Sequence, residues 1–282
     1  MSITPITPVL SKKNAFGVVA TLFLALVLAG CWGGGDTAGG GAGGASLAKL
    51  EASMVPVSGG TFTIGCREGV DVDLVDGAAV PDTNCLKPAN RETTVADFHI
   101  CIYEVTQGLW KDVMGASNNP SAQKGDDLPV TNVTGAEINA FFTELNSKRA
   151  DGQYTYRLPT ESEWEYAARG GANVEAFVYS GGNTADDVAW YGKDLPPVED
   201  AGNSGGSLHA VGSRLPNILG LYDMSGNAWE VVQVGNTNRA ERGGSWFGPK
   251  RYCRVTYRNY LVNAGGVDPV SDRGFRIAAT AK

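Results

Sequence analysis

Two complete helix-start signals in the middle third of the chain constrain the fold more than any other feature. Thr134 and Thr160 are each followed three residues later by a glutamate, a capping box in which a hydroxyl and a carboxylate satisfy free backbone N–H groups. Apolar residues follow the first box with helical spacing, at Ile138, Phe141, Phe142 and Leu145. From residue 172 onward, short apolar runs alternate with Gly, Asn, Asp and Pro, which predicts loops and short strands. Residues 49–282 are therefore expected to form a single irregular, loop-rich α+β domain.

The first part of this domain carries strand patterns and one more helix start. We expect two short strands at residues 54–57 and 61–65 around a Ser-Gly-Gly turn, and a central strand over residues 93–105. The polar residues 67–92 are expected to form a long loop. Thr106 is a candidate cap for a short helix that follows it.

The N-terminus has the pattern of an export signal. Lys12 and Lys13 precede an uncharged apolar run over residues 15–29 that leads to Cys31. A basic start, an apolar stretch and small residues before a cut site are typical of a secretory signal peptide, and Leu-Ala-Gly-Cys resembles the lipobox of bacterial lipoproteins. We expect residues 1–30 to be a lipoprotein signal peptide and Cys31 to be lipidated. An ordinary signal peptide with an incidental cysteine is the alternative.

Residues 31–48 follow and are rich in glycine, so we expect a flexible tether that holds the domain off a membrane. The predicted location is the bacterial envelope, in the outer membrane or at the cell surface, with the lipid anchor as the membrane contact. Export also permits disulfides, and the four remaining cysteines allow three pairings. A bond between Cys66 and Cys85 could close the predicted loop, and Cys101 and Cys253 lie in apolar stretches that fit buried free thiols.

Charge and histidine content exclude two classes of function. The formal net charge is −7, and nucleic-acid binding depends on clustered Lys and Arg, so no nucleic-acid partner is expected. The chain has 2 histidines, His99 and His209, which excludes a catalytic metal site built on three histidines. His209 stands in a stretch rich in Gly and Ser and is expected to be exposed.

Six phrases of the sequence occur in the order and spacing of one protein family. They are residues 54–62, 103–106, 156–170, 217–230, 242–246 and 274–276. Together they resemble the formylglycine-generating enzyme family of sulfatase-modifying proteins, over nearly all of residues 50–278. The resemblance implies an irregular α+β fold of the C-type lectin kind. It leaves function open, because the family includes oxidases, iron-dependent sulfoxide synthases and exported ligand-binding proteins.

The resemblance further indicates that this chain is not an enzyme. The family's oxidases carry two active-site cysteines, five residues apart, after a Gly-Gly-Ser strand. Counted from Ser245, the second falls on Cys253 and the first on Gly248. Glycine can neither bind copper nor attack a thiol, and soft Cu(I) prefers paired sulfur ligands. The iron of the sulfoxide synthases needs a histidine cluster that this chain lacks. The alternative is an exported sulfatase-modifying oxidase that acts with Cys253 alone.

Residues 243–276 resemble the variable region of proteins diversified by diversity-generating retroelements. The segment is bracketed by the Arg-Gly-Gly-Ser-Trp and Gly-Phe-Arg phrases, and residues 247–272 contain no Glu, Gln, Met or Trp, as randomised Asn codons predict. Its Tyr, Phe, Asn, Ser and Gly content is similar to that of antibody paratopes. The candidate ligand-binding residues are Phe247, Gly248, Pro249, Arg251, Tyr252, Tyr257, Asn259, Tyr260, Leu261, Val262, Asn263, Val267, Asp268, Val270 and Ser271.

A diversified residue must avoid the core, where a large-to-small change costs about 2–5 kcal/mol. Five positions are therefore expected to be exposed on one patch with Phe247, Gly248 and Pro249: Tyr257, Asn259, Tyr260, Val262 and Asn263. Four framing residues are expected to be buried: Trp246, Val255, Phe275 and Ile277.

No cofactor is predicted, although three residues could offer oxygen ligands to calcium: Asp223, Asn227 and Glu230. Such residues are more often turn formers and caps. Three glutamates at the start of the second helix are explained by the helix dipole rather than by catalysis: Glu161, Glu163 and Glu165.

The sequence as a whole predicts a surface-displayed lipoprotein without catalytic activity. Its diversified C-terminal segment, on a lectin-like scaffold, is expected to bind an unknown protein or glycan ligand. A structural envelope lipoprotein without a specific ligand is the remaining alternative.

Overall fold

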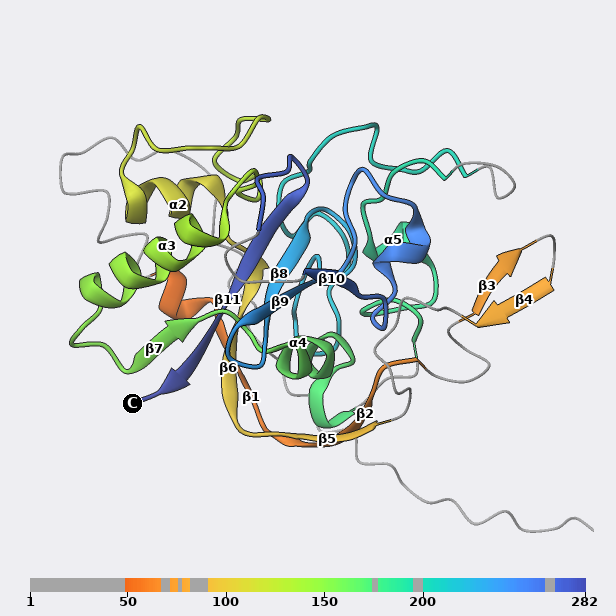
Figure 1. Cartoon of the computed structure of the whole chain (residues 1–282), viewed down its shortest axis with the longest axis horizontal. Coiled ribbons are helices and arrows are strands. Elements are labelled where there is room, and N and C mark those ends of the chain that lie inside the picture. The colour runs from red at the N-terminus through yellow and green to blue at the C-terminus, as the bar shows by residue number, and fades with distance from the viewer. Residues whose placement is uncertain are drawn as a thin grey trace, which may run out of the picture. The chain divides into compact units, whose positions relative to one another are not determined.

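The computed structural model describes residues 49–66, 72–75, 78–81, 91–173, 177–194, 200–261 and 267–282 (Figure 1). Several predicted features lie outside the described residues: the signal peptide, Cys31, the tether over residues 31–48, Cys85, Val262 and Asn263. Within the described part of the chain, no helix is both long and apolar enough to cross a membrane.

A mixed sheet of seven strands organises the fold (Figure 1). The strands are β1 Met54–Val57, β6 Phe98–Glu104, β7 Tyr154–Arg157, β8 Trp229–Val234, β9 Asn238–Arg242, β10 Asn259–Leu261 and β11 Arg273–Ala281. Their order is β1–β6–β11–β8–β9–β10, and β7 pairs with the C-terminal part of β11. Neighbours are antiparallel except β8 and β11, which are parallel. The last strand of the chain therefore lies between β6 and β8 and joins the two halves of the sheet.

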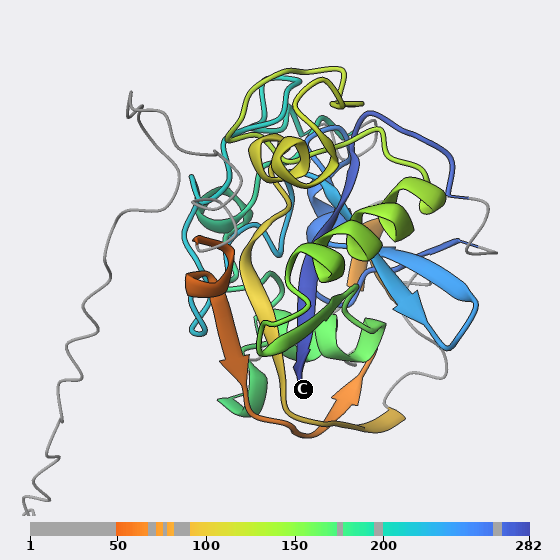
Figure 2. The ribbon, with the colours of Figure 1, turned by 90° about the vertical axis from the view of Figure 1, so that its left-hand side faces the viewer.

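Helices cover both faces of this sheet, with α2 and α3 side by side on one of them (Figure 2). The helical elements are α2 Gln107–Met114, α3 Gly135–Lys148, α4 Glu161–Ala168, α5 Ala185–Val188, and the 3₁₀ turns η1 Gly171–Asn173 and η2 Lys250–Cys253. Val231 and Val232 are consecutive in β8, yet Val231 packs in a core with α2 and α3, and Val232 in a core with α4. Successive side chains of a strand point to opposite faces, so β8 contributes to both cores.

The described residues include two smaller antiparallel sheets that the sequence only partly predicts. One pairs β2 Gly60–Ile64 with β5 Arg91–Val95, and the other pairs β3 Val72–Val75 with β4 Ala78–Pro81. The second pair lies within residues 67–92, so the expectation of a strand-free loop is wrong. The prediction of one strand over residues 93–105 is also wrong, because the stretch divides between β5 and β6. At the division, the Asp97 carboxylate accepts a hydrogen bond from the backbone N–H of Gly59 at 2.7 Å.

The predicted helix starts are confirmed. The hydroxyl of Thr134 accepts from the backbone N–H of Glu137 at 3.2 Å, and the Glu137 carboxylate accepts from the backbone N–H of Thr134 at 2.8 Å. Thr160 and Glu163 make the same reciprocal pair at the start of α4. Thr106 caps α2. Local capping chemistry thus places three helices correctly.

The cysteines divide as expected between a disulfide and buried thiols. Cys66 is disulfide-bonded. Cys101 and Cys253 are free and buried. Burial raises the pKa of both thiols above the ordinary value, so neither has the character of a reactive thiolate.

Candidate functional site

The candidate ligand-binding segment runs from the end of β9, through η2 and β10, to the start of β11. Both ends belong to the main sheet, and β10 pairs with β9. Two hydrogen bonds join the first part of the segment to the loop after α5: the N–H of Gly192 donates to the carbonyl of Gly248, and the hydroxyl of Ser204 to the carbonyl of Trp246, both at 2.7 Å. The segment is therefore held at both ends and again shortly after its start.

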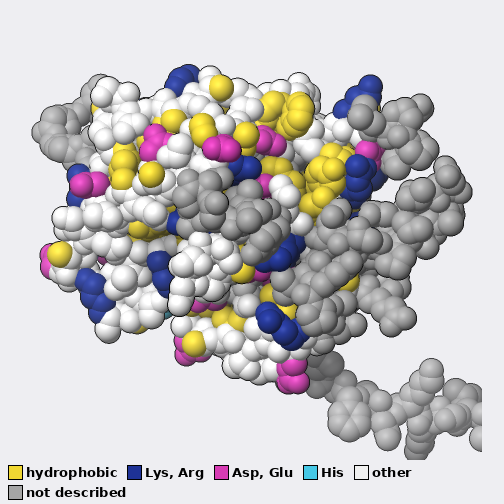
Figure 3. All heavy atoms as spheres, in the orientation of Figure 1, with side chains coloured by type: hydrophobic (Ala, Val, Ile, Leu, Met, Phe, Trp, Pro, Cys, Tyr) yellow, Lys and Arg dark blue, Asp and Glu magenta, His cyan; other side chains and the backbone are white. Residues whose placement is uncertain are grey.

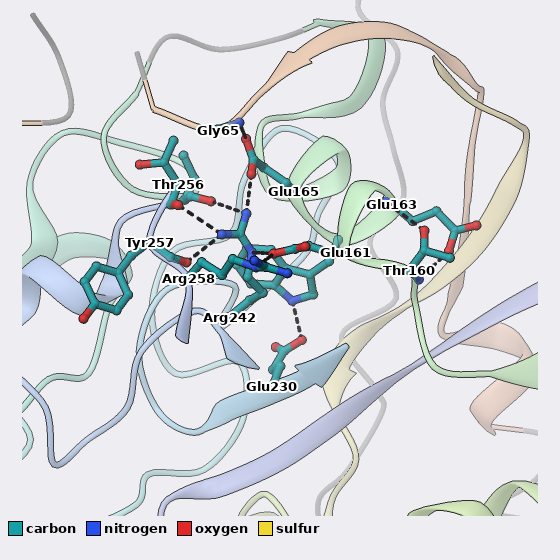
Figure 4. A network of polar contacts seen from close by, with 12 residues as sticks. Gly65, Thr160, Glu161, Glu163, Glu165, Glu230, Arg242, Thr256, Tyr257 and Arg258 are labelled. Carbon is teal, nitrogen blue, oxygen red and sulfur yellow. Dashed lines mark hydrogen bonds and ion pairs between the residues drawn. The ribbon is translucent and has the colours of Figure 1, made fainter. Parts of the chain in front are cut away.

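A buried ion-pair network determines the path of the segment (Figure 4). The guanidinium of Arg242, at the end of β9, forms a fully buried ion pair with the carboxylate of Glu165 in α4. It also donates to the backbone carbonyls of Val255, Thr256 and Tyr257 at 3.1, 3.0 and 2.7 Å. A guanidinium has five N–H donors in a rigid arrangement, so one side chain can bind a carboxylate and three carbonyls together. Arg242 thereby fixes residues 255–257 against the core.

The glutamates of α4 extend this network beyond the role that the helix dipole predicts. Glu165 also accepts from the backbone N–H of Gly65 at 2.9 Å and from the guanidinium of Arg169 at 2.7 Å. Glu161 forms an ion pair with Arg258 at 2.6 Å. Burial of an unpaired charge is costly, so these carboxylates and arginines are retained together. They tie α4 to β2 and to the C-terminal segment.

The predicted exposure is wrong for three residues of the segment, which are buried: Gly248, Pro249 and Tyr257. Val267, another candidate binding residue, is also buried. Tyr257 is 8% exposed, because Arg242 holds its backbone and its ring packs near those of Trp229 and Tyr252, with centroids 5.9 and 4.6 Å away. Val267 joins the core that contains α2 and α3. These residues support the fold rather than present a surface.

Other candidate residues do face solvent. Phe247 is 70% exposed. Three more are exposed: Asn259, Asp268 and Ser271. Three are half-buried: Arg251, Tyr252 and Val270. Tyr260 and Leu261 lie in the edge strand β10. Among the framing residues, Val255, Phe275 and Ile277 are buried as predicted, whereas Trp246 is half-buried and corrects the expectation.

Position 248, where the resemblance places the first oxidase cysteine, could take a side chain only if the Tyr252 ring moved. A Cβ atom on Gly248 would lie 2.8 Å from the ring of Tyr252. The other expected thiol, Cys253, is 0% exposed, and its raised pKa disfavours the thiolate that binds a metal or attacks a substrate. One buried, protonated thiol beside a filled space does not fit a copper site.

We use the name aromatic surface for four aromatic residues that are exposed or half-buried: Trp190, Trp246, Phe247 and Tyr252. The rings of Trp246 and Phe247 are 5.5 Å apart in an edge-to-face arrangement. The backbone of Asn227 links the two tryptophans, since its N–H donates to the carbonyl of Trp190 and its carbonyl accepts from Trp246, both at 2.9 Å. Figure 3 shows hydrophobic side chains gathered beside Lys and Arg near the position of α5.

The two faces of the Trp190 ring are already covered. The His209 ring stacks on it with centroids 3.6 Å apart, and the guanidinium carbon of Arg214 lies 3.6 Å from the same centroid. Two groups that close to one centroid fit only on opposite faces of the ring. His209 is therefore half-buried rather than exposed as predicted. The free apolar area of the aromatic surface belongs chiefly to Phe247.

Charges beside the aromatic surface are paired within the protein. Arg251 forms an ion pair with Asp194, and Lys250 with Asp200 at 2.5 Å. The hydrogen bond from Lys250 lowers the pKa of Asp200 below its ordinary value. Both basic residues of η2, Lys250 and Arg251, are thus paired with acids. Phe247 therefore has apolar area and paired basic side chains near it in the chain.

The candidate calcium ligands serve internal contacts. The amide of Asn227 donates to the carboxylate of Glu104 at 2.7 Å, and Glu230 forms a fully buried ion pair with Arg276 at 2.6 Å. Burial raises the pKa of Asp223 to about 6, and burial with the charge of Asp223 raises the pKa of Glu104 well above its ordinary value. In the part of the chain described, no group of three His, Cys, Asp or Glu residues could hold a metal ion. Asn227 and Glu230 are thus already engaged by Glu104 and Arg276.

Residues 45–281 match the sulfatase-modifying factor enzyme 1-like domain. The chain belongs to this family. It is 33% identical to Chaperone protein LppX of Paenibacillus barcinonensis, over 73% of this chain and 88% of that protein. It is 32% identical to the inactive C-alpha-formylglycine-generating enzyme 2 of Mus musculus, over 63% of this chain and 56% of that protein. The structure of Treponema denticola variable protein 1 aligns with a TM-score of 0.60 at 28% identity, covering 80% of this chain and 94% of that one.

Membership in the sulfatase-modifying factor family confirms the resemblance and the single, mixed α+β domain. The family contains formylglycine-generating enzymes as well as a relative named inactive and one named a chaperone. Membership therefore leaves activity to be argued from the site.

Sequence reasoning missed the residues that hold the site together. Arg242 and Arg276 stand in the two framing phrases, but neither phrase names the glutamates that pair with them. The stack of His209, Trp190 and Arg214 also gave no signal, because its members are brought together by loops. The arginines of the two framing phrases and the several glutamates at one helix start were the available signal in the sequence.

Proposed function

We propose that this protein is an exported lipoprotein that binds a protein partner through its aromatic surface and performs no chemistry on that partner. The observation that carries the proposal is the Tyr252 ring beside Gly248. The space of the first oxidase thiol is filled by a side chain of the aromatic surface. With Tyr252 in this position, the surface and a cysteine at position 248 would compete for the same space.

The chemistry of the aromatic surface favours a protein over a glycan as its partner. Phe247 is exposed, with Trp246 and Tyr252 half-buried around it. Aromatic and arginine side chains of this kind commonly carry most of the energy of protein interfaces. Since Lys250 and Arg251 are already paired with acids, a partner would gain by burying apolar area. The similarity to LppX, which is named a chaperone protein, supports a protein partner.

Diversification and anchoring complete the proposal. The similarity to a variable protein and the composition of residues 247–272 support a segment in which exposed positions such as Phe247 and Asn259 vary. Tyr257 and Val267 are buried and would stay constant. The signal peptide and Cys31 would anchor the chain in the bacterial envelope, with residues 31–48 as the tether.

Site-specific photocrosslinking tests the binding surface. A photoreactive phenylalanine analogue is placed at Phe247 in the full chain and expressed at native level in the cells that produce it. The matched control carries the analogue at Glu144, an exposed position on α3. We expect a discrete protein adduct from position 247 and none from position 144. No adduct from position 247, or equal adducts from both, would contradict the proposal.

The rival enzymatic function has its own test. The purified protein is incubated with copper and a sulfatase-type peptide that contains cysteine, and the mass of the peptide is then measured by mass spectrometry. We expect no formylglycine, because Gly248 leaves Cys253 without a second thiol. Copper-dependent formation of formylglycine would contradict the proposed binding function and show that the protein is an oxidase.

A second candidate function is that of a chaperone for exported proteins, favoured by the similarity to LppX. The test is the aggregation of reduced lysozyme, followed by light scattering, with equimolar full chain. A chaperone would suppress aggregation, and Phe247→Ser would weaken that suppression while Glu144→Ser would not. Equal suppression by both variants, or none by the wild type, would remove this candidate.

A further inference from the structure

A cavity of about 390 Å³ lies where α3, β7 and the β8–β9 hairpin meet. Figure 2 shows α3 alongside this hairpin, and the side chains of Asn139 in α3 and Arg239 in β9 are in contact. Asn139, Thr143 and Thr160 are exposed, so they form the mouth of the cavity. The volume is within the range of small-molecule sites. The cavity shares no lining residue with the aromatic surface.

Arg239 is the unusual residue of this cavity. It is only 4% exposed, and its Nη2 donates to the amide oxygen of Asn139 at 2.6 Å. Its Nε and Nη1 atoms are buried and have no hydrogen-bond partner. Among the described residues, no carboxylate forms an ion pair with it, in contrast to Arg242 and Arg276. Burial lowers the pKa of Arg239, as expected for a cation without a counter-ion.

The rest of the lining leaves this positive charge uncompensated. Arg157 also lines the cavity, but its guanidinium makes two hydrogen bonds of 2.7 Å to the carboxylate of Glu163. Among the residues that the structure describes, no Asp or Glu lines the cavity. Buried cations in proteins are paired or bind anions, so the cavity presents one unit of unneutralised positive charge with free N–H donors.

The apolar residues of the lining favour a ligand that has an apolar part besides its charged group. Phe142, Tyr156 and Leu158 contribute ring and aliphatic surface to the lining. A carboxylate carries one negative charge and matches the single free guanidinium, whereas a phosphate monoester carries about −1.5 to −2 near neutral pH and would leave excess charge buried. We propose that this cavity is a binding site for a small monocarboxylate with an aromatic or aliphatic body, held by Arg239.

Benzoate and benzamide provide matched probes, since they share a ring but only benzoate is charged. The detergent-solubilised full chain is titrated with each at constant ionic strength, by calorimetry and by thermal unfolding. We expect saturable binding and a rise in the unfolding midpoint with benzoate, and at least tenfold weaker binding of benzamide, inorganic phosphate or chloride. Equal effects of benzoate and chloride, or of benzoate and benzamide, would overturn the assignment.

Two variants separate binding from folding. Arg239→Met removes an unpaired buried charge, so the unliganded protein should unfold no more easily than wild type while benzoate affinity falls at least tenfold. Asn139→Asp supplies an internal carboxylate to Arg239 and should also abolish benzoate binding, with a raised midpoint in the unliganded protein. Undiminished benzoate affinity in both variants would overturn the proposal. Neither variant alters the aromatic surface, so this test and the crosslinking test can fail independently.

Discussion

Tyr257 and Phe247 allow a direct test of how the C-terminal segment is divided between core and surface. Both are large aromatic residues of one segment, yet Tyr257 is 8% exposed and Phe247 is 70% exposed. We expect Tyr257→Ala to destabilise the domain. Phe247→Ala should leave the free energy of unfolding unchanged within about 0.5 kcal/mol.

The size of the Tyr257 effect follows from its surroundings. Truncation of a buried aromatic residue to alanine costs about 3–5 kcal/mol, and each aromatic pair adds about 0.5–1.5 kcal/mol beyond burial. Tyr257 has two such partners, Trp229 and Tyr252. Because Tyr252 is half-buried, its ring and water can refill part of the space, so we expect a loss near the lower limit, about 3 kcal/mol. For a domain of this size, that loss lowers the unfolding midpoint by about 6–12 °C.

Urea unfolding monitored by tryptophan fluorescence, together with scanning calorimetry, measures both variants against wild type. Phe275→Ala serves as the reference for a fully buried ring. A Tyr257→Ala protein within about 0.5 kcal/mol of wild type would show that Arg242 does not hold this residue in the core. If Phe247→Ala loses as much stability as Phe275→Ala, Phe247 is part of the core and its assignment to the aromatic surface is wrong.

Three further predictions concern charge and anchoring. Burial raises the pKa of Asp223 to about 6 from 3.8, so the native state binds more protons than the unfolded state between these values and wild-type stability falls as pH rises through that window. Asp223→Asn, which does not titrate, should therefore gain stability relative to wild type between pH 4 and pH 7, by up to about 3 kcal/mol in urea unfolding; a difference independent of pH would contradict this. Arg242→Lys should cost about 3 kcal/mol by calorimetry, because one ammonium group cannot bind Glu165 and three carbonyls together, and a loss below about 1 kcal/mol would mean the network is dispensable. Cys31→Ser should release the protein from membranes or block its processing, and cell fractionation identical to wild type would refute lipidation.

Features that depend on neighbouring residues were predictable from the sequence. The capping boxes at Thr134 and Thr160 act over three residues, so the helix starts did not depend on the rest of the fold. The family phrases and the glycine at position 248 were also evident in the sequence, and they sufficed to assign the family and to question the oxidase site. The division of residues 93–105 into β5 and β6 was not predictable, because it depends on pairing with β2 and β11, far away in the chain.

Tertiary structure alone decided which residues of the C-terminal segment are surface and which are core. Tyr257 and Phe247 are indistinguishable by composition or periodicity, and a buried arginine that binds three consecutive carbonyls decides between them. The same holds for Arg239, whose lack of a counter-ion appears only when α3 is placed against β9. Local patterns record the chemistry of residues adjacent in the chain, whereas burial and ion pairing depend on which distant segments meet.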